Sequence, residues 1–246
     1  MVFQLIFKVR TPIIVDGPMH LDALLAAVHP AAHNQEIFLT RRSAAEDVHQ
    51  IPLEIDRAWM PGGMWVCCCS TADYSDDAKP FSTKLATAKK PQDYFYLNAM
   101  QTPRTGPGRD RLDTVYGVAC SSVSFLVSAR KASKLDRLAK RVKNIGGLRK
   151  AGYGEVVEYE LLERPDLDWR DCLVSKDGFA LRNMPAEMVE SDEITSVVVR
   201  APYWVSSMAV PGVTEGASIR LRSEVELRED CKRKSSVDGS QPGDAE

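Results

Sequence analysis

Strand patterns and helix patterns alternate along this chain, and their order constrains the fold more than any other feature. Residues 2–10 (VFQLIFKVR) alternate apolar and polar side chains like a β-strand, and residues 18–29 have helical spacing up to Pro30. Strand-forming pieces follow between residues 35 and 71. A second strand, helix and strand are predicted near residues 115–130, 133–144 and 155–163. Two strand–helix–strand units with antiparallel pairing predict an α+β, ferredoxin-like (RRM-like) domain over residues 1–163.

The remaining segments differ from these units in composition. Residues 72–115 are polar and rich in Lys, Pro and Thr, so we expect a long internal excursion of loops or a hairpin there. Residues 164–228 contain short strand patterns and predict a small β-rich extension. Residues 229–246 have almost no apolar side chain, which predicts a disordered tail.

A glycine-rich loop, IGGLRKAGYGEV, lies at residues 145–156, between the second helix and the last strand of the predicted domain. It has no Ser or Thr after its lysine, as a Walker loop requires, and it follows a helix, unlike a dinucleotide-binding loop. Glycines allow a bent phosphodiester chain to approach the backbone, while basic and aromatic side chains add contacts. A glycine-rich turn with solvated charges is the alternative. The candidate RNA-binding residues here are Gly146, Gly147, Arg149, Lys150, Gly152, Tyr153 and Gly154.

Charge is unevenly distributed along the chain, although its formal net charge is only −2. Residues 130–154 hold nine basic residues and one acidic residue, whereas residues 155–246 hold 20 acidic and 11 basic residues. The total argues against a wholly basic nucleic-acid binder, but the basic centre predicts a face that binds a polyanion. Lys143 lies in this basic centre and is a further candidate RNA contact.

A second arginine-containing segment, RTGPGRDRLDTVY at residues 104–116, supports RNA as the ligand. The arginine fork suits phosphates and base edges better than the lysine ammonium group does. The candidates are Arg104, Arg109 and Arg111, with Tyr116 available for stacking on a base. His20, at the start of the first helix, is a further candidate RNA contact, or the base of a ribonuclease.

Histidine and cysteine do not form a metal-binding pattern, and we expect no cofactor. His29 and His33 are four residues apart, but Pro30 interrupts the helix that this spacing needs. Cys67, Cys68 and Cys69 are consecutive, so their side chains alternate between faces of a strand, and we expect buried free thiols in a reducing cytoplasm. No apolar run is long enough to span a membrane.

Several motifs together resemble the RAMP superfamily of CRISPR-associated proteins, and most closely the Cas-five-like (Csf-three) subunit of type IV effector complexes. The resemblance is carried by HLDALLA at 20–26, IPLE at 51–54, the Arg/Gly segment at 104–116, the glycine loop at 145–156, and APYW at 201–204 with VPG after it. These motifs cover nearly the whole chain except the tail, and their order is more specific than any one of them.

The resemblance implies a non-catalytic subunit that caps the 5′ handle of the guide RNA (crRNA) in antiviral or anti-plasmid defence. It also implies contacts with the backbone and large subunits of a cytoplasmic prokaryotic complex, and an indirect contact with target DNA through that complex. Two alternatives stay open. The first is a metal-independent endoribonuclease that processes CRISPR repeat RNA, and the second is a scaffold that contacts only proteins.

Overall fold

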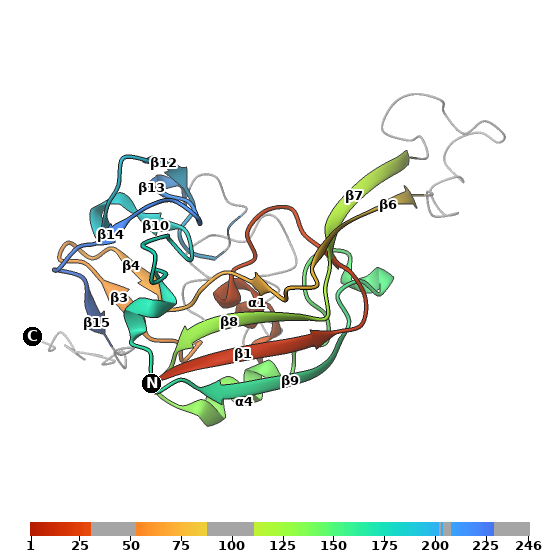
Figure 1. Cartoon of the computed structure of the whole chain (residues 1–246), viewed down its shortest axis with the longest axis horizontal. Helices are drawn as coiled ribbons and strands as arrows, with labels where there is room; N and C mark the ends of the chain where they lie inside the picture. The colour runs from red at the N-terminus through yellow and green to blue at the C-terminus, as the bar shows by residue number, and fades with distance from the viewer. Residues whose placement is uncertain (31–52, 88–110, 202, 204–207, 229–246) are drawn as a thin grey trace, which may run out of the picture.

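Strands predominate in the computed structural model, which describes residues 1–30, 53–87, 111–201, 203 and 208–228 (Figure 1). These residues form five small sheets, in which every strand pair is antiparallel. The largest sheet has four strands, in the order β5 (Asp73–Tyr74), β8 (Ser122–Ser128), β1 (Val2–Val9) and β9 (Val156–Glu163). β1, the strand that its alternation of apolar side chains predicts, occupies an inner position.

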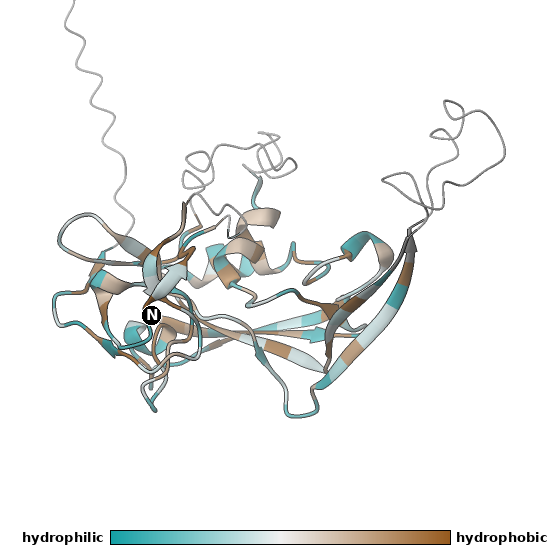
Figure 2. Ribbon diagram, turned by 90° about the horizontal axis from the view of Figure 1, so that it is seen from above, coloured by the Kyte–Doolittle hydropathy of each residue, from teal (hydrophilic) through white to brown (hydrophobic). Residues whose placement is uncertain are grey.

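One core lies between this sheet and two α-helices, α1 (Leu21–Val28) and α4 (Ala132–Ala139). Phe3, Leu5 and Phe7 project from alternate positions of β1 into the same cluster as the apolar side chains of both helices. The two helices lie on one side of the sheet (Figure 2). This arrangement leaves the charged side of α4 exposed, because only Leu135, Leu138 and Ala139 of that helix are buried.

A second core forms in the C-terminal half of the chain and also takes Ala58, Val66 and Cys68 from the central segment. Three small sheets and two 3-10 helices surround it. The sheets are β10 (Met184–Pro185), β13 (Val210–Val213) and β12 (Thr195–Val197); β11 (Val189–Glu190) and β14 (Arg220–Leu221); and β15 (Glu226–Arg228), β3 (Arg57–Trp59) and β4 (Trp65–Cys67). The 3-10 helices are η3 (Trp169–Cys172) and η4 (Ala186–Met188).

The predicted excursion contains a long hairpin, β6 (Lys79–Thr87) and β7 (Arg111–Ala119), which projects away from the central sheet (Figure 1). Residues 88–110, between its strands, lie outside the described residues. β7 also pairs with β2 (Ile13–Ile14), so that the base of the hairpin is joined to the segment between β1 and α1.

The predicted α+β, ferredoxin-like (RRM-like) fold is wrong, because the described chain is mainly β, with five antiparallel sheets and two eight-residue α-helices. Strands expected to complete the first strand–helix–strand unit pair elsewhere, because β3 and β4 form a sheet with β15. Between α1 and β7, the described strand that joins the central sheet is the two-residue β5, which lies at the start of the predicted excursion. The physical reason is that hydrophobic alternation predicts a strand but does not select the neighbour with which it hydrogen-bonds.

The expected division into residues 1–163 and 164–228 stays a prediction, and the predicted disordered tail at 229–246 lies outside the described residues. Within the described residues, no helix is long and apolar enough to cross a membrane.

Candidate nucleic-acid interface

The glycine-rich loop is held against the segment that joins β1 to α1. The amide of Gly147 donates to the carbonyl of Ile14 at 2.7 Å, and the amide of Gly154 donates to the carbonyl of Pro12 at 2.8 Å. Thr11 braces the loop further, because its hydroxyl donates to the carbonyl of Gly152 and accepts from the amide of Glu155, both at 2.8 Å. The loop is therefore a fixed part of the fold.

Two of the loop glycines are required by the chain's own packing. Gly146 and Gly154 have φ values of +81° and +61°, which side-chain-bearing residues rarely adopt. A Cβ on Gly154 would lie 1.9 Å from the carbonyl oxygen of Ile145, and one on Gly146 would lie 2.5 Å from that of Ile14. Gly152 differs, since its φ is +87° but no atom lies within 4 Å of an added Cβ.

Three of the loop's glycine amides form hydrogen bonds within the chain. The amides of Gly147, Gly152 and Gly154 all donate to carbonyls of the chain. These three amides are thus used inside the fold and do not point to a ligand.

The basic side chains of the loop sit on a short 3-10 helix, η2 (Arg149–Ala151), which begins after Leu148. Leu148 itself has a left-handed φ of 51°, and its side chain is exposed. Arg149 and Lys150 are both exposed on η2. The two cationic side chains are therefore exposed, whereas the loop glycines contact residues 12–14.

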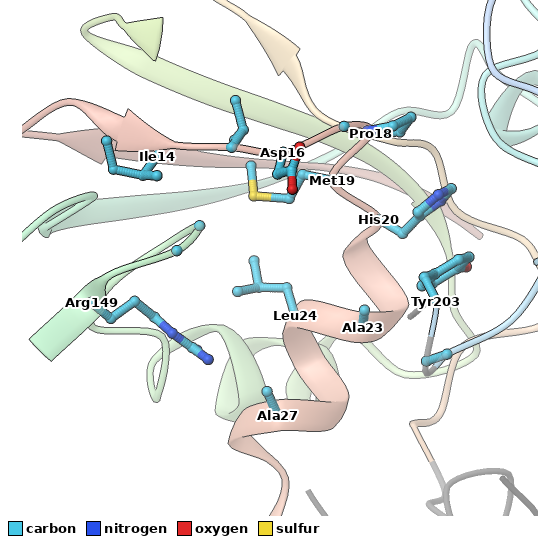
Figure 3. Close-up of a pocket in the computed structure, with 15 residues that line it drawn as sticks. Ile14, Asp16, Pro18, Met19, His20, Ala23, Leu24, Ala27, Arg149 and Tyr203 are labelled. Carbon is cyan, nitrogen blue, oxygen red and sulfur yellow. The ribbon is translucent and has the colours of Figure 1, made fainter. Parts of the chain in front are cut away.

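A pocket of about 350 Å³ separates this loop from α1 (Figure 3). Ile14, Met19, Leu24 and Ala27 give it mainly apolar walls. Arg149 extends from the glycine loop toward α1, opposite Leu24 and Ala27 (Figure 3). The pocket therefore combines an apolar surface with a guanidinium group, an arrangement that suits a flat ring bearing an anionic group.

His20 lies at the other end of this pocket, beside Tyr203 (Figure 3). The two rings are stacked, with centroids 3.8 Å apart and planes inclined by 6°. The imidazole is 4% exposed, and its Nδ1 has no hydrogen-bond partner among the described residues. Burial, reinforced by the charge of Arg182, lowers the pKa of His20 to about 3, although Asp22 opposes the shift. The ring is therefore neutral at neutral pH.

A buried ionic network beneath this end of the pocket fixes Tyr203 and the first turn of α1. The fully buried guanidinium of Arg182 donates to Asp22 at 3.3 Å, to the hydroxyl of Tyr203 at 2.6 Å, and to the carbonyls of Cys67, Cys69 and Val199. The hydroxyl of Tyr203 donates in turn to Asp22 at 2.9 Å. Burial strongly raises the pKa of the Tyr203 phenol, so it stays protonated as this donor.

Sequence reasoning missed this network, although two signals for it were present. Asp22 stands among apolar residues in the HLDALLA motif, and Tyr203 belongs to the APYW motif. A buried carboxylate needs a cationic partner, but nothing in the sequence identifies Arg182, which is 160 residues away, as that partner.

The structure brings several of the predicted RNA contacts together. His20, Gly146, Gly147 and Arg149 all line the same pocket. Tyr116, 67% exposed, lies on β7, whose neighbouring Gly117 pairs with Ile14 of β2. Because Ile14 also pairs with Gly147, β2 joins the base of the hairpin to the glycine loop.

Other candidates are placed differently or lie outside the described part. Tyr153 packs near Phe81 of β6, with ring centroids 6.2 Å apart, so its ring is engaged within the fold. Lys143 is exposed between α4 and the loop. Arg104 and Arg109 lie outside the described residues, and of Arg111 only its place at the start of β7 is described.

The basic centre forms an exposed surface over α4 and the glycine loop. Lys134 is half-buried and pairs with Glu54. The exposed members are Arg130, Lys131, Arg137, Lys140, Arg141, Lys143, Arg149 and Lys150. In the described ranges, no group of three or more His, Cys, Asp or Glu side chains is placed to hold a metal ion. Burial raises the pKa of the free thiols of Cys67, Cys68, Cys69 and Cys172, so these thiols are protonated.

The chain was compared with protein families, solved structures and curated proteins. A family model described as CRISPR type IV associated protein Csf3 matches residues 2–214 of the chain. Among solved structures, the crystal structure of a CRISPR protein from Archaeoglobus fulgidus is similar over 92% of this chain and 90% of that chain, with 14% sequence identity and a TM-score of 0.35. A comparison with curated proteins finds no match. The matched region includes both the glycine loop and the pocket.

Proposed function

Because the chain belongs to the Csf3 family of type IV CRISPR-associated proteins, we propose that it is a non-catalytic subunit that binds the 5′ handle of the guide RNA. Family membership connects the chain to CRISPR defence. Beyond family membership, we propose that the ligand is RNA, that it binds at the glycine loop, and that the protein does not cleave it. We also propose that the protein contacts the backbone and large subunits of the complex.

The observation that carries the proposal is the position of Arg149, which projects from a rigid glycine loop over an apolar pocket. An unstacked base fits apolar walls such as those formed by Leu24 and Ala27, while its phosphate pairs with the guanidinium fork. Lys150 and the exposed basic residues of α4 continue the positive surface beyond the pocket. A single RNA strand leaving the pocket would therefore meet further cations.

The state of His20 supports a binding role over a catalytic one. A general base works best when its pKa lies near the working pH, whereas burial lowers the pKa of His20 to about 3. Its ring is also covered by Tyr203. We therefore assign His20 a structural role at the wall of the pocket, and the endoribonuclease alternative becomes an outcome of the test.

The test measures binding and cleavage of labelled CRISPR repeat RNA together, in EDTA, across a series of salt concentrations. The double variant Arg149→Ala plus Lys150→Ala should weaken binding. It should also reduce the magnitude of the slope of log binding constant against log salt concentration (the salt slope) by about 1.4, since each single-strand phosphate contact contributes roughly 0.7. A matched control is Lys176→Ala plus Arg220→Ala, which removes the same charge from the C-terminal half.

Intact RNA with a reduced slope in the loop variant alone supports the proposal. An unchanged slope and affinity would exclude Arg149 and Lys150 as phosphate contacts. A discrete RNA product that disappears in His20→Gln would instead establish the endoribonuclease.

A further inference from the structure

The turn between β2 and α1, residues 16–18, forms one wall of the pocket described above. Among the described residues that line this pocket, Asp16 alone is acidic. Asp16 and Arg149 come from different segments of the chain and lie on different sides of the pocket (Figure 3). The pocket thus presents a hydrogen-bond acceptor as well as the guanidinium donor, and the proposed contact with a phosphate uses only the second of these groups.

The turn that carries Asp16 is anchored to the fold on both sides. Before it, the amide of Val15 donates to the carbonyl of Tyr116 at 3.3 Å, at the base of the β6–β7 hairpin. After it, the carbonyl of Met19 accepts from the amide of Ala72 at 2.9 Å. Asp16 is therefore held in place beside the pocket, as a residue that distinguishes between ligands must be.

The carboxylate of Asp16 is exposed, and within the described residues it has no hydrogen-bond or ion-pair partner. Neighbouring carboxylates differ in this respect. Glu155, at the end of the glycine loop, pairs with Arg10, and Asp136 on α4 accepts from the hydroxyl of Tyr159 at 2.9 Å. An unpaired carboxylate repels a phosphate, so RNA bound in this pocket is favoured only where it directs a hydrogen-bond donor at Asp16.

Apolar side chains lie between the two charged residues of the pocket. Met19 and Leu24 both line it, and Met19 lies next to Asp16 (Figure 3). A thioether packs well against an aromatic ring, and the volume of about 350 Å³ suits one small planar group. A base placed against these side chains would turn its polar edge toward Asp16.

We propose that this pocket selects guanine, and that Asp16 is the specificity-determining residue. A carboxylate has two acceptor oxygens and no donor. The Watson–Crick edge of guanine offers two adjacent donors, the N1–H and the N2 amino group, which fit both oxygens of one carboxylate. Adenine and cytosine present one amino group beside a ring acceptor, and uracil presents one N–H between two carbonyl oxygens. Each of these three bases would therefore direct an acceptor at Asp16.

The inference rests on the proposed function for the identity of the ligand as RNA, and adds the base that the RNA places in the pocket. Arg149 binds a phosphate, which is the same in every nucleotide, whereas Asp16 discriminates between bases. A ribose 2′-hydroxyl can also donate to a carboxylate, but it does not use the apolar walls beside Asp16. The pocket therefore favours contact with a base over contact with a sugar.

The experiment uses the full chain and short oligouridines that carry one central guanosine, inosine, adenosine or cytidine, together with the corresponding DNA oligonucleotides. Guanosine should strengthen binding about tenfold relative to uridine, as a bidentate contact to a base edge does. Inosine lacks only the N2 amino group and should bind between the two. Asp16→Asn should abolish the guanosine preference and leave the salt slope unchanged, because Asp16 contacts no phosphate.

Asp177→Asn is the matched control, since Asp177 is an exposed carboxylate outside the pocket and its replacement should preserve the guanosine preference. Thermal unfolding of both variants identifies any loss of fold. Because Asp16 is itself exposed, Asp16→Asn should unfold at the wild-type temperature.

The outcomes separate this inference from the proposed function. A salt slope that depends on Arg149 and Lys150, without a guanosine preference or with one that persists in Asp16→Asn, overturns the inference alone. A preference that depends on Asp16, with a normal slope in Arg149→Ala plus Lys150→Ala, supports the inference and refutes the phosphate site.

Two further results would also decide against guanine selection. A loss in Asp16→Asn that is equal for every base and absent with DNA would assign Asp16 to the ribose 2′-hydroxyl. A chain that binds none of these RNAs at any salt concentration overturns the inference and the proposed function together.

Discussion

Replacing Gly154 with alanine should destabilise the protein far more than the same replacement at Gly152, although both glycines belong to one loop and both have positive φ. A side chain in the left-handed region costs about 1–2 kcal/mol at either position. At Gly152 that is the whole cost, because no atom lies within 4 Å of the new Cβ. Gly152→Ala is therefore a matched control for the backbone conformation.

At Gly154 the new Cβ would lie 1.9 Å from the carbonyl oxygen of Ile145, so the loop must move. Movement breaks or weakens two backbone hydrogen bonds, from Gly154 to Pro12 and from Ile145 to Gly154, both 2.8 Å long. Each contributes about 1 kcal/mol net, so the total loss at Gly154 is about 3–4 kcal/mol.

Urea unfolding followed by circular dichroism gives the free energy of unfolding of each variant. We expect Gly154→Ala to lose about 2 kcal/mol more than Gly152→Ala, the difference being the two hydrogen bonds. Equal losses would refute the reasoning, because they would mean that the contact between Gly154 and Ile145 does not constrain the loop.

Other variants probe the pocket and the network beneath it. Tyr203→Phe should lower the free energy of unfolding by about 1–3 kcal/mol in thermal denaturation, because Asp22 and Arg182 lose a buried partner. The free energy of unfolding should fall as the pH drops from about 6.5 toward 3, because His20 binds a proton in the unfolded chain but not in the folded protein over this range. In His20→Gln, the free energy of unfolding should depend less on pH over the same range. Ala27→Phe should fill the pocket and weaken RNA binding without changing the salt slope, which a filter-binding series would measure; a changed slope would mean that the phosphate contacts had moved as well.

Local sequence patterns predicted the parts of the molecule that depend on neighbouring residues. The alternation in residues 2–10 predicted β1, and apolar spacing predicted the existence of α1 and α4, although α4 ends at Ala139 and not at residue 144. The glycine content of residues 145–156 predicted a loop with unusual backbone angles. These features follow from side-chain periodicity and backbone sterics, which are properties of short segments.

Only the tertiary structure decided which segments meet. In the structure, β3 pairs with β15, more than 160 residues away in the sequence. The described strands form five sheets and not the expected ferredoxin-like sheet. It also placed Arg182 against Asp22, and Arg57 and Arg200 over one indole ring. The physical reason is that burial, strand pairing and ion pairing are favourable with any complementary partner. Which partner a residue meets therefore depends on how the whole chain packs.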